Sequence, residues 1–453
     1  MTYYRVIIVN MEGNPYRPGP GLPPAVLAGR KADFAEARTA AESVAAGLGT
    51  APLVYFGLRG VGKTVLVRAI ARELEDRQFF PLVVEAEKGR NFGRVLTEAV
   101  GQRDDDFAAL GTRVGRTAKR LLGVLPKVSF DLPHDAGSIS LTRTKIDEDP
   151  HVKSLVSSLS DLNAELNSAG RSLLIAVDEA QEADLLTLRA ILRVIHASMG
   201  TDRAILGIFA GTPTLRAHLG RAHTYAERFS FSEIAMLDTQ DTRRALVEPA
   251  EQHKTRFTRG ALERLINVTA GYPYFVQLYG AYTWQAHEEH LIDAADVEAA
   301  IPLVEQKLDA GFYRVRLDRL SPREVAYAMA LRSLGPGMHP VSNVAAQLGR
   351  SVREASSIRN RLVEKGMLYS PLPGAIAFSV PLFDRFLERH RAELERLLVT
   401  EPFDGRKKSN YRGARSIRWD AEPILQPAQT EFVERAKRLP GATRRRIVGQ
   451  SAE

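Results

Sequence analysis

The chain has 453 residues, 44% hydrophobic and 26% charged, and a chain of this length usually folds into two to four domains. It contains no cysteine, which excludes disulfide bonds, cysteine nucleophiles and thiolate zinc sites. Its longest apolar runs, such as residues 173–177, are far shorter than the roughly 20 residues of a membrane span, and the opening residues lack a signal-peptide core. We therefore expect a cytoplasmic protein.

The net charge of +8 is unevenly distributed along the chain. Residues 401–453 hold 12 Lys and Arg against 7 Asp and Glu, which leaves this tail with five surplus positive charges. A basic tail of this kind can bind nucleic acid. The alternative is a solvated, disordered end without a ligand.

The chain opens with a segment rich in proline and glycine, which reads EGNPYRPGPGLPP over residues 12–24. Proline lacks a backbone N–H, so this composition excludes both a helix and a central strand. We expect residues 1–24 to form an extended arm. An alanine-rich helix is predicted to follow over residues 31–47.

Short apolar runs then alternate with segments of helical apolar spacing. Continuous apolar strands between helices are typical of a parallel sheet that is covered on both faces. The sequence thus predicts an α/β core over residues 25–237, with strands near residues 53–56, 82–85, 173–177, 204–210 and 229–234.

One segment interrupts this alternation, and helical segments follow the core. Residues 113–148 contain a basic helix and two alternating runs around a turn, which predict an insertion that ends in a hairpin. Residues 238–308 are predicted to be helical, and residues 309–400 to be helical with one short hairpin. The basic tail of residues 401–453 completes the chain.

The segment Gly57-Leu58-Arg59-Gly60-Val61-Gly62-Lys63-Thr64 matches the phosphate-binding pattern G-x-x-x-x-G-K-[ST], with a strand before it and a helix after it. Glycines let the backbone wrap closely around phosphate, and the helix N-terminus adds positive potential. Lys63 is expected to reach the β- and γ-phosphates, and the Thr64 hydroxyl to bind Mg²⁺. The predicted nucleotide contacts are Gly57, Arg59, Gly60, Val61, Gly62, Lys63, Thr64 and Val65.

An acidic pair, Asp178-Glu179, follows the apolar run of residues 173–177. A buried strand that delivers a carboxylate at its end is the usual partner of a phosphate loop. Asp178 is then predicted to hold Mg²⁺, and Glu179 to act as the general base for an attacking water, which favours hydrolysis over binding alone. The alternative is a pair that caps the next helix.

Thr212 follows the next predicted strand, in the segment Ala210-Gly211-Thr212. A polar side chain at this strand end can contact the γ-phosphate or the attacking water, so Thr212 is a further catalytic candidate. An ordinary turn at the end of a strand is the alternative.

Taken together, GLRGVGKT, LLIAVDEAQ and AGTPTL followed by AERF resemble the AAA+ ATPases near origin-recognition initiators and the related STAND-like signalling ATPases. The segment PPAVLAGR before the phosphate loop resembles the LxGR segment of these proteins, and GYPY at residues 271–274 resembles their lid motif G-x-P. The resemblance covers residues 14–400. It implies a P-loop AAA+ core with a parallel sheet, a helical lid over residues 238–308 and a C-terminal winged-helix domain.

The resemblance also implies roles for individual residues. Val26 and Leu27 would pack against adenine, and Pro273 would contact the nucleotide from the lid. Arg228 falls near the position of an arginine finger that acts on the ATP of a neighbouring subunit, which implies a homo-oligomer; a surface ion pair is the alternative. The chain departs from the pattern in having no clear sensor-2 arginine within residues 271–280.

The region of residues 309–400 has the order of elements of a winged helix. A short helix over 341–348, a turn, a second helix over 352–365 and a hairpin over 367–380 are predicted. One face of the second helix is apolar, and the other carries donors suited to phosphates and base edges. The predicted DNA contacts are Arg350, Arg353, Ser357, Arg359 and Asn360.

Two functions follow from these features. The first is an ATP- and Mg²⁺-dependent switch that hydrolyses ATP and binds double-stranded DNA through the winged helix. The second is a STAND-like signalling or defence ATPase whose C-terminal segments make protein contacts. A small-molecule kinase fits less well, because Glu179 directly follows Asp178 and suits hydrolysis.

Overall fold

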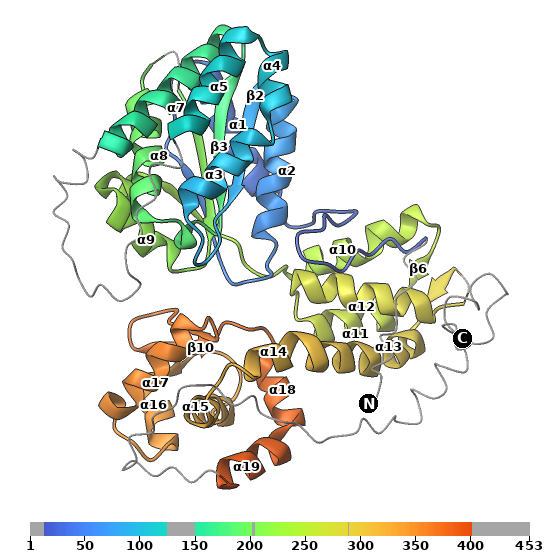
Figure 1. Cartoon of the computed structure of the whole chain (residues 1–453). Helices are drawn as coiled ribbons and strands as arrows, with labels where there is room; N and C mark the ends of the chain where they lie inside the picture. The colour runs from blue at the N-terminus through green and yellow to red at the C-terminus, as the bar shows by residue number, and fades with distance from the viewer. Residues whose placement is uncertain (1–12, 125–149, 202–203, 289, 401–453) are drawn as a thin grey trace, which may run out of the picture. The chain divides into compact units, whose positions relative to one another are not determined.

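The computed structural model describes residues 13–124, 150–201, 204–288 and 290–400 (Figure 1). These residues divide into two compact units. We call residues 20–23 and 27–236 the core unit, and residues 13–19, 24–26 and 237–400 the helical unit. Among the described residues, no helix has the length and apolar character needed to cross a membrane.

The core unit is built on a parallel sheet of five strands in the order β2-β3-β4-β1-β5. Burial of every β1 residue and nearly all of β3 explains their continuous apolar sequence. The predicted α/β class and parallel sheet are confirmed. The strands are β1 (Leu53–Phe56), β2 (Phe79–Glu85), β3 (Ser172–Asp178), β4 (Leu206–Gly211) and β5 (Ser230–Glu233).

Helices cover both faces of this sheet (Figure 1). One face carries α1 (Lys31–Ala45) and α2 (Lys63–Glu75). The other face packs on the main apolar core, to which α3, α5, α7, α8 and α9 contribute. The remaining elements of the unit are α3 (Phe92–Gly101), α4 (Asp104–Ala109), α5 (Thr112–Val124), α7 (Pro150–Ser168), η2 (Ala180–Glu182), α8 (Leu185–Ser198), α9 (Leu215–Ala222) and η3 (Thr224–Arg228).

Helix α5 covers the first part of the predicted insertion at residues 113–148. Its apolar side chains Val114, Ala118 and Leu121 lie one turn or nearly two apart and are buried in the main core. The first part of the expected insertion therefore belongs to the core, and its basic residues occupy only the outer face of an amphipathic helix. The hairpin predicted in its second part lies outside the described residues.

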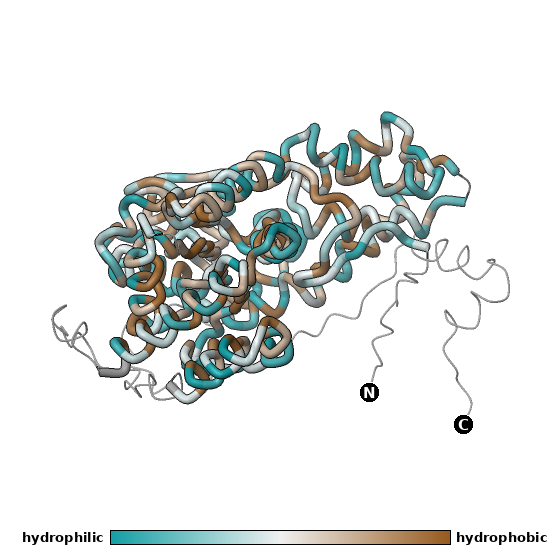
Figure 2. The backbone as a smooth tube through the Cα atoms, turned by 90° about the horizontal axis from the view of Figure 1, so that it is seen from above, coloured by the Kyte–Doolittle hydropathy of each residue, from teal (hydrophilic) through white to brown (hydrophobic). Residues whose placement is uncertain are grey.

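The helical unit begins with four helices and a small ladder. Strands β6 (Arg256–Phe257) and β7 (Leu291–Ile292) pair in parallel, a feature that the sequence pattern does not predict. In Figure 2, brown and teal stretches alternate along the tube, as expected for helices with one buried face. The helices are α10 (Thr239–Gln252), α11 (Arg259–Thr269), α12 (Pro273–Ala286) and α13 (Ala294–Lys307).

The described part of the N-terminal arm packs against these helices. Tyr16 is fully buried, and its hydroxyl donates to the carbonyl of Leu246 in α10 at 2.5 Å. Asn14 donates to the carbonyl of Ala281 in α12 at 3.0 Å. Gly280 makes room for the tyrosine, because a Cβ atom there would lie 2.8 Å from its ring. The arm is thus anchored by specific side chains despite its prolines.

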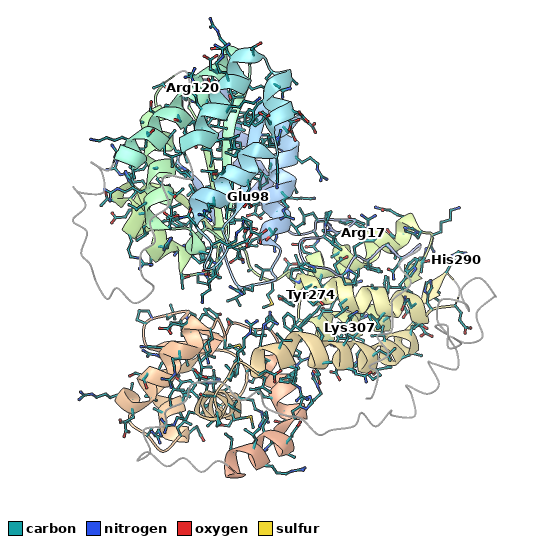
Figure 3. The ribbon with its side chains drawn as sticks, in the orientation of Figure 1. Arg17, Glu98, Arg120, Tyr274, His290 and Lys307 are labelled. Atoms are coloured by element: carbon teal, nitrogen blue, oxygen red, sulfur yellow. The ribbon has the colours of Figure 1, made fainter. Side chains whose placement is uncertain are left out.

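A helical connection leads from α13 into the C-terminal segment of the unit, residues 318–400. It comprises the π-helix η4 (Leu308–Tyr313) and α14 (Arg314–Leu317). Phe312 stacks on Tyr274 of α12, labelled in Figure 3, with ring centroids 5.8 Å apart. Tyr313 stacks on Phe386 of the C-terminal segment, at 5.0 Å. The rings of η4 therefore contact both α12 and the segment around Phe386.

The C-terminal segment alternates helices with a small antiparallel sheet of order β8-β10-β9. Along the chain, helices α16 and α17 lie between strands β8 and β9, and the hairpin follows them as predicted. Helices α18 and α19 follow the hairpin. The elements are α15 (Pro322–Ser333), β8 (His339–Pro340), α16 (Val341–Gln347), α17 (Val352–Glu364), β9 (Leu368–Tyr369), β10 (Ala375–Phe378), α18 (Phe383–Arg389) and α19 (Arg391–Thr400).

Candidate functional site

The predicted phosphate loop, acidic pair and Thr212 follow three neighbouring strands of the core unit. Strand β4 lies between β1, which leads into the loop, and β3, which ends at Asp178. The N–H of Gly57 donates to the carbonyl of Gly211 at 3.1 Å, so the loop starts beside the end of β4. All three segments meet at the carboxyl edge of a parallel sheet, where such folds bind ligands.

Two glycines of the phosphate loop are required by its geometry. A Cβ atom on Gly57 would collide with the carbonyl oxygen of Ile234, which follows β5. Gly62 adopts a φ of 97°, a left-handed conformation that other residues rarely accept. Gly62 is also the N-cap of α2 and supplies no side-chain acceptor to the helix. The first N–H groups of α2 can therefore serve an anion.

The side chain of Lys63 folds back onto the first residues of the phosphate loop. Its side chain is buried, and its ammonium donates to the carbonyls of Gly57 at 3.1 Å and Leu58 at 2.8 Å. Burial lowers the pKa of Lys63, and the negative charges of Glu179 and Asp178 oppose this effect. A positive charge at this position would be stabilised further by phosphate oxygens.

The other predicted nucleotide contacts in the phosphate loop differ in how far their side chains are exposed to solvent. Arg59 and Gly60 are exposed, and Thr64 and Val65 are half-buried. Val61 is only 1% exposed and packs inward, so its side chain does not face a ligand and only its backbone is available. Arg30 was not predicted as a site residue, yet its buried guanidinium donates to the carbonyls of Val61 at 3.0 Å and Ala235 at 2.9 Å. Its signal was the LAGR segment before the loop.

Asp178 is a buried carboxylate, and only one of its two oxygens accepts a hydrogen bond from the described residues. Its Oδ1 atom accepts the N–H of Glu179 at 2.9 Å, whereas Oδ2 has no hydrogen-bond partner among the described residues. Burial raises the pKa of Asp178, and the nearby hydroxyl of Thr64 acts in the opposite direction. A buried carboxylate oxygen beside a threonine hydroxyl is a donor set that suits Mg²⁺.

Glu179 has an unusual backbone and a tightly held side chain. Its φ of 47° lies in the left-handed region, which costs a residue with a side chain roughly 1–3 kcal/mol. Gln181 donates to Glu179 Oε2 at 2.6 Å and accepts the N–H of Thr212 at 3.0 Å. Asp184 caps α8 instead, by accepting the N–H of Thr187 at 2.8 Å, so the acidic pair is not the cap of that helix.

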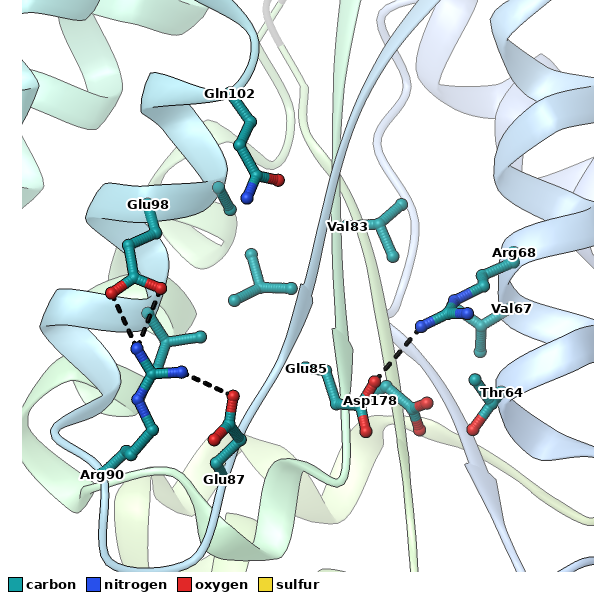
Figure 4. A pocket seen from close by; sticks show the side chains of 13 residues that line it. Thr64, Val67, Arg68, Val83, Glu85, Glu87, Arg90, Glu98, Gln102 and Asp178 are labelled. Carbon is teal, nitrogen blue, oxygen red and sulfur yellow. Dashed lines mark hydrogen bonds and ion pairs between the residues drawn. The ribbon is translucent and has the colours of Figure 1, made fainter. Parts of the chain in front are cut away.

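A pocket of about 440 Å³ opens between α2, the end of β2 and α3 (Figure 4). Thr64 and Asp178 line it on one side, where Arg68 pairs with Glu85 at 3.2 Å. Burial raises the pKa of Glu85, and the charges of Asp178 and Glu179 reinforce this effect. On the other side, Arg90 is paired with both Glu87 and Glu98.

Four residues with predicted roles in ATP binding or hydrolysis come from segments other than those that hold the phosphate loop, the acidic pair and the end of β4 at the carboxyl edge of the core sheet. Arg228 is exposed in η3, and its guanidinium lies over the ring of Tyr225 at 5.6 Å. Val26 and Pro273 belong to the helical unit, and Leu27 opens the main part of the core unit. The roles of these four residues stay predictions. Thr212 is half-buried, and its hydroxyl lies 2.8 Å from that of Thr214.

Two family models match the chain. Residues 26–207 match a family described as "AAA ATPase domain". Residues 310–387 match a family described as "Domain of unknown function (DUF8462)". No curated protein matches the chain.

Solved structures that match the chain share little sequence with it. Cdc6p from Pyrobaculum aerophilum is 13% identical, with a TM-score of 0.40 over 87% of this chain and 100% of that chain. ORC1 from Aeropyrum pernix, solved in complex with DNA, is 16% identical, with a TM-score of 0.41 over 83% and 96%. Thermotoga maritima RuvB, a Holliday junction branch migration motor, is 14% identical, with a TM-score of 0.39 over 80% and 95%.

The family match covers the phosphate loop, the first three strands of the sheet and the acidic pair that ends β3. The geometry of these parts agrees with it, since β1 and β3 flank β4 and deliver Lys63 and Asp178 to one edge. Residues 26–207 are therefore an AAA ATPase domain.

Proposed function

We propose that the protein binds ATP with Mg²⁺ and hydrolyses it at the carboxyl edge of the β1, β3 and β4 strands. The observation that carries this proposal is the acidic pair at the end of β3. Asp178 offers an unpartnered, buried oxygen, and Glu179 stands next to it with a half-buried carboxylate. Lys63 and the N-terminus of α2 supply the positive potential for the phosphates.

The residues fit a bound Mg²⁺. Asp178 and the Thr64 hydroxyl would hold it together with phosphate oxygens and water, and when bound it would neutralise charge on the phosphates. Among the described residues, no group of three or more His, Cys, Asp or Glu forms a protein-only metal site. This agrees with Mg²⁺ sites in which the substrate phosphates complete the coordination.

Each of these residues would have a separate role in hydrolysis. Lys63 would hold the β- and γ-phosphates, and the N–H groups at the start of α2 would surround them. Glu179 would accept the proton of the attacking water. Thr212, at the end of β4, would contact the γ-phosphate or that water. Val26, Leu27 and Pro273 would pack around the adenine base, as the family resemblance implies.

The binding of Mg²⁺ should weaken on acidification at a higher pH than for an ordinary aspartate. Burial raises the pKa of Asp178, so this carboxylate takes up a proton at a higher pH than an ordinary aspartate as the pH falls. Protonation removes the charge that would hold the cation, so the contribution of Asp178 to affinity is present above its raised pKa and lost as the pH falls through it. Titration of Mg²⁺ in the presence of ATP over a series of pH values checks this. An affinity that stays constant down to the usual aspartate range contradicts it.

We further propose that residues 309–400 form a winged helix that binds double-stranded DNA under the control of the nucleotide. Helix α17 buries Ala355, Ile358 and Leu362 on one face. Its other face exposes three of the predicted DNA contacts, Arg353, Ser357 and Asn360, while Arg350 and Arg359 are half-buried. A helix with this division can enter a major groove, and its arginines can reach phosphates and guanine edges.

Three charged neighbours of this face have structural roles. Glu354 accepts hydrogen bonds from the backbone N–H and the hydroxyl of Ser351, which forms the capping box of α17. Arg361 and Lys365 both pair with Glu324 of α15, which is only 1% exposed. Burial acts to raise the pKa of Glu324, but hydrogen bonds from Lys365 and Ser321 outweigh it, and the pKa lies below its usual value. These two cations therefore belong to the fold of the module.

Arg353→Glu combined with Arg359→Glu should reduce duplex affinity at least roughly tenfold, since each change removes a cation and adds repulsion with phosphate. The slope of log affinity against log salt should also decrease by about one for each phosphate that the variant no longer binds. A fluorescence titration with a duplex over several salt concentrations measures both. Arg256→Glu, at an exposed position in β6, is the control. An unchanged affinity and salt slope in the double variant would refute DNA binding by this face.

One observation favours the alternative of a signalling ATPase with a protein partner. The described side chains of residues 309–400 include four large apolar ones that are exposed: Val315, Met338, Val352 and Leu372, with exposed fractions of 49%, 55%, 42% and 56%. A contiguous patch of exposed apolar side chains can mark a protein contact. Native mass measurement with and without ATP, beside the duplex titration, separates the two functions. ATP-dependent oligomers without duplex affinity would support the signalling function and an intersubunit role for Arg228.

A further inference from the structure

Gln181 joins two of the proposed catalytic residues through one side-chain amide. Its Nε2 atom donates to Glu179 Oε2 at 2.6 Å, and its Oε1 atom accepts the backbone N–H of Thr212 at 3.0 Å. The N–H of Thr212 can only donate, and an ionised carboxylate can only accept. A flipped amide would therefore place donor against donor and acceptor against acceptor, so the orientation of the amide is fixed by its two partners.

The backbone around the amide of Gln181 leaves space for it. A Cβ atom on Gly211 would collide with Gln181 Oε1, so the last residue of β4 has to be glycine while the amide stays in this place. Gln181 lies in η2, which begins directly after Glu179. Glu179 itself adopts the left-handed conformation, with φ of 47°. Backbone of this kind persists where the surroundings hold it, and it is common at functional sites.

We propose that Gln181 is a positioning residue for hydrolysis, which orients the Glu179 carboxylate and couples it to the end of β4 through Thr212. This inference rests on the proposed function. The hydrogen bond occupies Oε2 of Glu179, and Oε1 can then accept the proton of an attacking water. Any movement of the Thr212 backbone changes the position of the amide and, with it, the direction of the carboxylate.

The test replaces the amide by a side chain of similar length that forms no comparable hydrogen bond. Gln181→Met should lower kcat for ATP hydrolysis roughly tenfold while ATP affinity stays within about twofold of the parent, because the change acts on orientation in the chemical step. Gln252→Met, at the exposed end of α10, is the matched control and should behave as the parent does. Thermal unfolding of each variant shows whether the fold is kept.

Two further variants distinguish positioning from a merely structural role. Gly211→Ala leaves Gln181 in the chain but displaces its amide, and it should produce a similar loss of kcat. In a Glu179→Gln background, Gln181→Met should cause little further loss, because a residue that acts through Glu179 has nothing left to orient.

The outcomes separate this inference from the proposed function. A parent protein that does not hydrolyse ATP contradicts the proposed function, and the inference is overturned with it. An active parent with Gln181→Met at the parental kcat overturns the inference alone and leaves the proposed function standing. Additive losses in the Glu179→Gln, Gln181→Met double variant would also overturn it, since they would show that Gln181 acts independently of Glu179.

Discussion

Replacing Lys63 by alanine is expected to abolish tight ATP binding. The ammonium is buried within the phosphate loop and holds the carbonyls of Gly57 and Leu58 at 3.1 and 2.8 Å. Charge-assisted hydrogen bonds contribute about 1.5–3 kcal/mol each, so losing those to the phosphates should weaken binding at least 10- to 100-fold. The same change removes the ties within the loop and so lowers its preorganisation.

Isothermal titration calorimetry with ATP and Mg²⁺ measures this effect. Lys119→Ala removes an exposed lysine of α5 that pairs with Asp104 at 3.6 Å, and it should bind ATP as the parent does. Thermal unfolding without nucleotide shows whether the Lys63 variant is folded. A folded Lys63→Ala protein with parental ATP affinity would mean that the nucleotide binds elsewhere.

Glu179→Gln is expected to keep ATP bound and to stop its hydrolysis. The amide has nearly the shape of the carboxylate but cannot accept the proton of the attacking water, and general-base catalysis typically contributes about 10²–10⁴-fold. Lys63, Thr64 and Asp178 remain in place, so affinity should change little. The variant should therefore accumulate the ATP-bound state.

Phosphate release under single-turnover conditions, beside a binding titration, measures both quantities. Glu182→Gln is the matched control, because it makes the same substitution three residues later and leaves in place the backbone N–H that donates to the carbonyl of Glu179 at 2.8 Å. Turnover of Glu179→Gln at the parental rate would show that another group accepts the proton.

The parts of the site that are contiguous in sequence were predictable. The loop from Gly57 to Thr64 and the acidic pair after β3 are short motifs whose chemistry requires those residue types at that spacing. Their meeting at one edge followed from the parallel sheet, because parallel strands place their carboxyl ends together. The alternation of apolar runs and helices was sufficient for the α/β class and for most strand positions.

Contacts between distant residues were not predictable in this way. Gln181 reaches Thr212 across 31 positions, and Arg30 reaches Ala235 across 205, and no local pattern encodes either pairing. Tyr16 looked like part of a proline-rich arm, although it is fully buried and bonded to Leu246. In α5, many basic residues concealed an apolar stripe that packs into the core. In each case tertiary packing decided what local composition left open.

We propose that ATP controls the binding of DNA by residues 309–400. A duplex titration of the Glu179→Gln protein, with and without ATP and Mg²⁺ and at several salt concentrations, tests this claim most directly. We predict salt-sensitive duplex binding whose affinity differs between the two nucleotide conditions. Duplex affinity that is undetectable in both conditions, or identical in both, would contradict the claim.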